Sequence, residues 1–427
     1  MAIIMLFIAL ALLGIGIPVA FVFGGAALAA ALLSPDLGLE VFNVLPFRIY
    51  GIMSNSTLMA VPLFILMGLL LERSGTAEKL LIAMTSLFGT LKGGLAVSVV
   101  LVGAILAATM GIVSASVVMM SLIALPLMIR AGYSKELSSG TIAASGTLGQ
   151  IIPPSVILII LSDVMNIGVG DLFVGAVLPG LVLVALYIVY IVVYAHMKPS
   201  AAPALPGEYH SGSAASLLWA VLPMLVLMGI VLGSIFAGIA SPSESAAFGV
   251  VGAIILSAMN RTLGKAMLVE SLRETLKLSG MIFMILIGAT AFSLVFNELG
   301  GSDQVIEFFG RNVDSAWMFI FIAMAVVFVL GFFIDFIEIS FIIVPILLPV
   351  MHAYGIDPLW FGILLAMNLQ TSFLTPPFGL SLFFVKGAAG DAVSSIQIYR
   401  GILPFVVLQI IALGLIMFFP DLVFAFV

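Results

Sequence analysis

The segment at residues 369–384 reads LQTSFLTPPFGLSLFF and is apolar enough for a membrane helix. Its middle, residues 371–379, nevertheless contains two consecutive prolines and a glycine. Each proline lacks a backbone N–H and fixes φ, so an intact helix cannot run through Pro376 and Pro377. In lipid, the backbone carbonyls that lose their donors are costly unless another group satisfies them. The segment therefore predicts a helix that is interrupted at membrane depth and stabilised there by something else.

The composition places the whole chain in a membrane. Of its 427 residues, 63% are hydrophobic and 8% are charged, whereas about 25% of an ordinary soluble domain is charged. The net charge of −6 and the lack of a basic run argue against nucleic acid as a partner. The chain has no cysteine, which excludes disulfides, thiolate metal sites and cysteine nucleophiles. Residues 1–33 carry no charge and lack the basic start of a signal peptide, so we expect a retained first membrane helix.

Short motifs recur along the chain in the same order, 223 to 225 residues apart, which indicates an internal duplication. The matching pairs are GIGIPVAFVFGG (14–25) with GIASPSESAAFG (238–249), LPLMIRAG (125–132) with LPVMHAYG (348–355), IIPPS (151–155) with LTPPF (374–378), and LPG (178–180) with LPF (403–405). We predict a first repeat at residues 1–197, a cytoplasmic linker at 198–216 and a second repeat at 217–427.

The positive charges orient the two repeats, because Lys and Arg collect in cytoplasmic loops. We expect membrane crossings near residues 1–33, 56–72, 136–165, 172–197, 217–238, 239–259, 278–297, 357–386 and 402–425. Of the 14 Lys and Arg, only Arg48 and Arg311 then lie outside. An odd number of crossings separates Pro18 from Pro242, so the second repeat is predicted to be inverted. The alternative, in which residues 136–165 do not cross, would place the four cations of residues 260–277 outside.

Two segments, at residues 94–130 and 317–350, are too long for one crossing. Each would be roughly 50 Å long as a straight helix, against an apolar core of ~30 Å. We expect each to be a re-entrant helical hairpin; two closely packed full crossings are the alternative. Residues 76–94 and 302–313 suit amphipathic arms in the two membrane interfaces. The predicted fold is thus an all-α polytopic membrane protein with two inverted repeats, each containing a re-entrant hairpin and a discontinuous helix (136–165 and 357–386).

Each break pairs with a hairpin tip in this prediction. The breaks read SGTLGQIIPPS (145–155) and QTSFLTPPF (370–378), and the tips read ATMGIVSAS (108–116) and GFFIDFIEIS (331–340). Unwound backbone at membrane depth offers helix N-termini to anions and free carbonyls to cations. Hard cations such as Na⁺ take oxygen ligands, which both breaks supply. We therefore expect a bound ion to stabilise the breaks.

The motifs GTLGQIIPPS, LTPPFGLSLFF, GFFID…VPILLPV and SPSESAAFG together resemble the large membrane subunit of tripartite ATP-independent periplasmic (TRAP) transporters. The resemblance covers essentially the whole chain. It implies an elevator-type fold of the ion-transporter superfamily and Na⁺ symport of a small carboxylate across the bacterial inner membrane. It also implies two partners, namely a small four-helix membrane subunit and a periplasmic substrate-binding protein.

The resemblance also implies at least two Na⁺ sites. In the second repeat the corresponding ligands are Gly331, Ser372, Thr375 and Phe378; Ser372 stands where the family often has glycine. In the first repeat the corresponding residues are Thr109, Gly111, Ser114, Gly149, Ile152 and Ser155. The tip TMGIVSAS departs from the serine-rich tip of many relatives, so the choice between Thr109 and Ser114 stays open.

No arginine lies in the predicted membrane core, so the substrate anion would be held by hydroxyls, amides and helix N-termini. The residues expected to hold it are Ser116, Ser145, Thr147, Asn368, Gln370 and Thr371, together with Asp335 and Glu338. The two carboxylates are three residues apart and share a helix face. Either these carboxylates contact the cation or the substrate, or they only accept hydrogen bonds from backbone amides. The second hairpin resembles the TRAP branch that handles 2-oxo and 2-hydroxy acids.

Other acidic residues and other functions fit the sequence less well. We interpret Glu244 as a helix N-terminal cap and Asp163 as an interfacial residue near a helix end. An intramembrane protease is disfavoured because the chain has no GxGD motif and its histidines lie in loops or at helix ends. A channel rarely needs two inverted halves with broken helices. The main alternative is a stand-alone Na⁺- or H⁺-coupled carboxylate carrier of the same superfamily, which would not require a separate small subunit.

Overall fold

A computed structural model describes residues 1–35, 37–111, 113–205, 214–376 and 379–427. This part of the chain is helical and contains no strand, which confirms the all-α prediction. Within it, seven helices are long and apolar enough to cross a membrane, or up to eight if the bent pair α4 and α5 is one span. The chain is thus a multi-pass membrane protein.

The described residues of the first half form ten α-helices: α1 (Ala2–Gly14), α2 (Val19–Leu33), α3 (Leu45–Met53), α4 (Ala60–Arg73), α5 (Thr76–Phe88), α6 (Gly94–Met110), α7 (Val113–Arg130), α8 (Lys135–Thr147), α9 (Val156–Met165) and α10 (Val169–Met197). The second half adds α11 (Ala214–Phe236), α12 (Pro242–Met259), α13 (Lys265–Glu298), α14 (Gly301–Asn312), α15 (Ala316–Leu330), α16 (Phe336–Ala353), α17 (Pro358–Leu374), α18 (Leu380–Ala389), α19 (Ser395–Phe418) and α20 (Asp421–Phe424).

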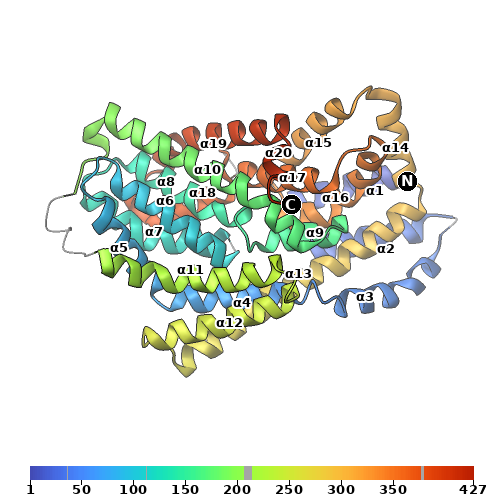
Figure 1. Ribbon diagram of the computed structural model, residues 1–427. Helices are drawn as coiled ribbons and strands as arrows, with labels where there is room; N and C mark the ends of the chain where they lie inside the picture. Colours follow the sequence, from blue (N-terminus) through green and yellow to red (C-terminus); the bar gives the residue numbers. More distant parts are fainter. Residues whose placement is uncertain (36, 112, 206–213, 377–378) are drawn as a thin grey trace.

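The order of helices repeats along the chain. Each helix from α5 to α10 has a counterpart, α14 to α19, that begins 222 to 226 residues later. This spacing agrees with the offset of the sequence motifs. In Figure 1 the two arm helices, α5 and α14, lie at opposite ends of the molecule. That placement agrees with inverted repeats, and the orientation of the repeats across a membrane stays a prediction.

The helices form two groups that lie side by side (Figure 1). We call α2, α4, α11, α12 and α13 the support bundle, in which α12 packs on α4 and α13 packs on α2 and α4. We call α6–α10 and α15–α19 the hairpin bundle, in which α8 packs on α19 and α7. The halves interlock there, because α16 contacts α9 and α18 contacts α7.

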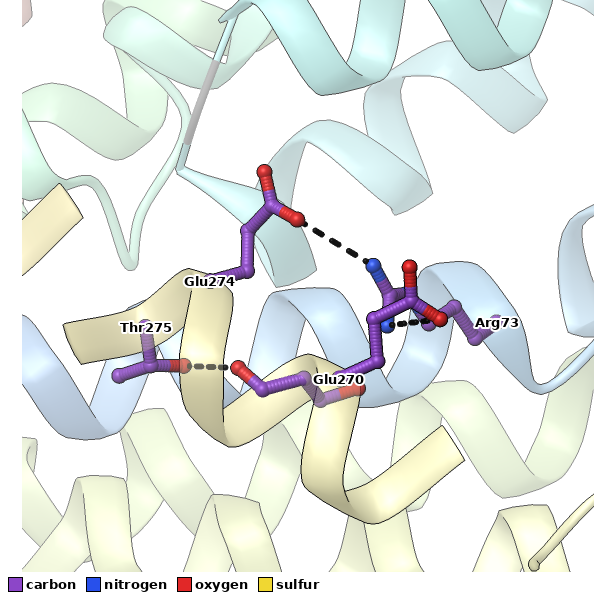
Figure 2. Close-up of polar contacts among 5 residues, drawn as sticks. Arg73, Glu270, Glu274 and Thr275 are labelled. Carbon is purple, nitrogen blue, oxygen red and sulfur yellow. Dashed lines mark hydrogen bonds and ion pairs between the residues drawn. The ribbon is translucent and has the colours of Figure 1, made fainter. Parts of the chain in front are cut away.

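Polar contacts join the two halves within the support bundle. Arg73 at the end of α4 pairs with Glu270 at 3.5 Å and Glu274 at 3.4 Å, both on α13 (Figure 2). Beside them, the Asn260 amide donates to the Ser74 carbonyl at 3.1 Å. These contacts fix the end of a first-half helix to the start of a second-half helix, so we expect the support bundle to behave as one unit.

Both long segments fold back on themselves, which the re-entrant hairpin and the pair of full crossings both require, so the re-entrant form stays a prediction. The first turns at Gly111, whose φ of +60° ends α6, and its two ends meet where the Leu95 N–H donates to the Tyr133 hydroxyl at 3.2 Å. In the second, the Tyr354 hydroxyl after α16 donates to the Val313 carbonyl just before α15, at 2.8 Å. A tyrosine hydroxyl thus closes the base of each hairpin, as an acceptor in the first and as a donor in the second.

The structure corrects the prediction of one helix at residues 1–33. Two helices, α1 and α2, are separated by a turn in which Gly16 has φ +87° and Pro18 is the N-cap of α2. The physical reason is local, since glycine adopts this φ without strain and proline at 18 cannot donate to a preceding turn. The signal was present in the sequence as GIGIP.

Two predicted loops are also more ordered than expected. Most of residues 260–277 belongs to α13, which runs unbroken for 34 residues from Lys265. The start of the predicted linker bonds to the base of the first hairpin, because the Ala202 carbonyl accepts the Gly93 N–H at 3.0 Å and the Leu205 N–H donates to the Gly89 carbonyl at 2.8 Å. The linker also ends earlier than predicted, since α11 begins at Ala214.

Candidate ion and substrate site

The first broken helix is interrupted where its prolines remove two donors. After α8 the chain makes a short 3₁₀ turn, Leu148–Gln150, and resumes as α9 at Val156. In an intact helix the Gln150 carbonyl would accept from residue 154, which is a proline. Instead it accepts from the Ser155 hydroxyl at 2.9 Å. A serine thus supplies the donor that Pro154 lacks.

The second break repeats this chemistry. The Phe373 carbonyl would accept from residue 377, again a proline, and it accepts instead from the Ser381 hydroxyl at 2.7 Å. The two carbonyls occupy matching positions, 223 residues apart. Serine hydroxyls thus donate to both carbonyls. Each carbonyl keeps a second lone pair, so both remain oxygens that an ion could coordinate.

Thr375 offers such oxygens where α17 ends. Its backbone is extended, its hydroxyl donates to the Thr371 carbonyl at 2.8 Å, and its carbonyl accepts the Gly379 N–H at 3.0 Å. Donating leaves the lone pairs of the hydroxyl free to accept or to coordinate. The residue facing the tip glycine of the second hairpin is Ser372: a Cβ on Gly331 would overlap the Ser372 hydroxyl.

The first tip meets its own break in the same way. A Cβ added to Gly111 would lie 3.0 Å from Val156 Cγ2, at the start of α9. One added to Gly149 would lie 3.1 Å from the Ala107 carbonyl oxygen, near the end of α6. Each hairpin tip therefore packs closely against the break of its own half, and the glycines permit that approach.

A cavity of about 120 Å³ lies where these elements meet. Both tips line it, with Gly111 and Ser114 from the first and Asp335 from the second, and the support bundle closes it with Ile65 of α4 and Met281 of α13. Ser114 and Asp335 are the polar side chains among its described lining residues, and no Lys or Arg is among them. The structure thus brings together three of the residues predicted to bind ion or substrate.

The start of four helices also faces this cavity. Its lining includes Val113, Val156, Phe336 and Leu380, which are the first residues of α7, α9, α16 and α18. A helix N-terminus has unpaired N–H groups and the positive end of the helix dipole. These helix ends favour an anion in the cavity without a basic side chain, while the Asp335 carboxylate in its lining already accepts the first N–H of α16.

Asp335 and Glu338 form a capping box at the start of α16. The Asp335 carboxylate accepts the Phe336 N–H at 2.6 Å, and the Glu338 carboxylate accepts the Asp335 N–H at 3.0 Å. Their bonds to backbone amides are therefore present, while contact of either with cation or substrate stays a prediction. Glu244 is confirmed as a cap, since its carboxylate accepts the Ser241 N–H at 2.8 Å.

The other predicted substrate residues are buried on the broken helices or, for Ser116, on α7. Most of their side chains donate hydrogen bonds to backbone carbonyls: Ser145 to Ile142, Thr147 to Ala144, Asn368 to Met324 and Thr371 to Met367. Asn368 and Thr371 line a different cavity, between α15, α17 and α19. The structure therefore does not bring these two to the cavity between the tips. Phe378 and the side chain of Thr109 lie outside the described residues.

Sequence reasoning missed two polar residues at the breaks. Ser381 is a hydroxyl in the otherwise apolar start of α18, and Gln150 is a lone amide directly before IIPP. The side chains of Gln150 and of the predicted Gln370 are buried, and none of their polar atoms has a hydrogen-bond partner among the described residues. Such unpaired amides are rare in a core, so these two mark the breaks as places for water or a ligand.

Residues 4–422 match the family model of the tripartite ATP-independent periplasmic transporter, DctM component. The chain belongs to this family. It is 31% identical to the C4-dicarboxylate TRAP transporter large permease protein DctM of Pseudomonas aeruginosa, over 92% of this chain and 90% of that protein. It is 30% identical to the sialic acid TRAP transporter large permease protein SiaM of Vibrio cholerae, over 96% of this chain and 95% of that protein.

These relatives confirm a large TRAP subunit that is a transporter and not an enzyme. Among solved structures, the YdaH transporter of Alcanivorax borkumensis superposes with a TM-score of 0.65 and covers 99% of both chains. The two sequences are 12% identical, so this likeness supports the fold alone.

Proposed function

We propose that this TRAP large subunit imports a small carboxylate across the bacterial inner membrane by Na⁺ symport. The observation that carries the proposal is the cavity on which the starts of α7, α9, α16 and α18 converge. The ends of α7, α9 and α18 favour an anion there, whereas the carboxylates of Asp335 and Glu338 cap the end of α16. The first three ends would hold a carboxylate without arginine. The small volume and the apolar walls favour a short organic acid over a large polar solute.

The oxygen atoms at the two breaks support Na⁺ as the coupling ion. The Thr375 hydroxyl and the extended backbone next to it lie in the second break, and Gly111 and Gly149 bring backbone close to the first. A cation bound near the cavity would offset the charge of the carboxylate and of Asp335. Binding of the ion and of the solute would then favour each other, which is what symport requires.

The family also points to partners. Its description as a component of a tripartite transporter, and the term large permease in the names of its relatives, support two further components. We assign these as a small four-helix membrane subunit and a periplasmic protein that delivers the carboxylate.

Transport by the reconstituted complex tests this function. Proteoliposomes containing the chain, its small subunit and the binding protein are given labelled 2-oxo acids, 2-hydroxy acids and C4-dicarboxylates in turn. We expect uptake of at least one of them with an inward Na⁺ gradient, and none above background without it. Equal uptake driven by a proton gradient in Na⁺-free buffer would contradict Na⁺ symport. Full uptake by the chain alone would favour the stand-alone carrier instead.

A further inference from the structure

A side-chain hydrogen bond links the turn between α3 and α4, next to the support bundle, to the hairpin bundle at a place away from the cavity. Asn55 precedes α4, and its amide nitrogen donates to the Asp163 carboxylate of α9 at 2.5 Å. The amide oxygen of Asn55 accepts the Thr57 N–H at 2.9 Å. Both ends of the Asn55 side chain are therefore engaged, and this fixes the direction of the bond to Asp163.

The bond connects parts that we expect to move relative to each other. It leads from the start of α4 to α9, whose first residue, Val156, lines the cavity between the bundles. A solute held between two bundles can leave toward either side only if one bundle shifts against the other. The Asn55–Asp163 bond spans that boundary, so its two ends are expected to separate when the bundles shift.

The second half has no equivalent bond among its described residues. At the repeat offset of 223, Asn55 corresponds to Leu278 and Asp163 to Lys386. Leu278 offers no polar group, and the Lys386 ammonium donates within its own segment, to the Gly390 carbonyl at 2.5 Å and the Val393 carbonyl at 3.1 Å. The bond between the bundles is thus a feature of the first half.

We propose that Asn55 and Asp163 are positioning residues that stabilise the conformation seen here over the others of the transport cycle. In a carrier with two inverted repeats, the repeats exchange roles as the site opens to one side and then to the other. A bond made by only one repeat therefore favours one of these states. This inference rests on the proposed transport function, since it assumes a cycle of at least two states.

The absence of cysteine in the chain allows a direct measurement of the conformation. Gly170 of α10 and Ile235 of α11 face each other across the bundles: a Cβ on Gly170 would lie 3.6 Å from Ile235 Cγ2. Cysteines at these two positions in the purified full-length chain should cross-link readily with a short thiol reagent. The rate of cross-linking then reports how often the bundles are arranged as in this structure.

The test variant is Asn55→Asp. It keeps an oxygen to cap the Thr57 N–H, but it replaces the donor with a carboxylate that repels Asp163. We expect cross-linking to slow about tenfold or more, as for loss of a hydrogen bond to a charged group. The double variant Asn55→Asp/Asp163→Asn restores a donor and an acceptor in the reverse direction, and should restore the rate. Asn312→Asp, on the exposed arm α14, is the matched control and should leave it unchanged.

An unchanged rate in folded Asn55→Asp would overturn the proposal, and so would a double variant that stays as slow as the single one. The assay needs neither Na⁺ nor substrate. A negative result would therefore leave the proposed transport function standing, and a failure to show Na⁺ symport would leave the cross-linking result interpretable.

Discussion

At the scale of single residues, the two serines at the breaks show how a membrane protein accommodates consecutive prolines. A buried carbonyl without a donor costs about 1–3 kcal/mol. Ser155 and Ser381 remove that cost at matching carbonyls, although they sit at different distances along the chain, five and eight residues after their acceptors. The requirement for a donor is therefore the same in both halves, while the residue that meets it differs.

At the same scale, we predict that the Thr375 hydroxyl contributes to Na⁺ binding. Thr375→Val keeps the β-branched shape and removes the hydroxyl, so the chain should fold while the proposed second-half Na⁺ site loses a ligand. We expect the half-saturating Na⁺ concentration for transport to rise roughly 5- to 150-fold, equivalent to about 1–3 kcal/mol. Uptake at graded Na⁺ concentrations measures it.

A matched control exists for the Thr375 variant. Thr290 of α13 makes the same kind of hydrogen bond, from its hydroxyl to the Leu286 carbonyl at 2.7 Å, and lies within an unbroken helix rather than at a break. Thr290→Val should leave the Na⁺ dependence unchanged. A stably folded Thr375→Val protein with unaltered half-saturation would remove Thr375 from the ion site and leave it as a helix cap.

At the scale of helices, the crossing of α8 and α19 depends on two glycines. A Cβ on Gly140 would overlap the Gly401 carbonyl oxygen, and a Cβ on Gly401 would overlap the Glu136 carbonyl oxygen. The backbones touch here, as is common where small residues meet between membrane helices. This contact fixes the first part of one broken helix against the second half of the chain.

We predict that Gly140→Ala lowers the stability of the folded protein by about 1–3 kcal/mol, because backbone rather than a flexible side chain occupies the space. The thermal unfolding midpoint in mild detergent should fall. Gly414→Ala, in the partner helix α19, places its Cβ in open space and should change stability by less than about 0.5 kcal/mol. Equal midpoints for the two variants would show that the crossing can relax.

At the scale of the whole molecule, the predicted inversion of the repeats assigns each loop to one side of the membrane. Cysteines at Gly207 and Gly264 should react with an impermeant thiol reagent only from the cytoplasm, and a cysteine at Ser302 only from the periplasm. The natural chain gives no background because it has no cysteine. Labelling of positions 207 and 302 from the same side would refute the inversion.

The sequence by itself determined the elements that depend on local backbone chemistry. Prolines break both discontinuous helices where the motifs place them, and the hairpins and arms have nearly the predicted ends, because missing donors and the cost of charge in lipid act within a few residues. The turn between α1 and α2 was encoded in the same local way by Gly16 and Pro18, although we interpreted that segment as one helix.

Only the tertiary structure decided which face of each helix meets which partner. The helices around the site are apolar on nearly all sides, so no polar stripe indicates their orientation. Asn368 and Thr371 resemble site residues in the sequence but line another cavity. The starts of α7, α9, α16 and α18 converge through contacts between the two halves of the chain, α9 with α16 and α7 with α18. The Asn55–Asp163 bond spans 108 residues. Such contacts depend on how the bundles pack, and no local sequence pattern predicts that packing.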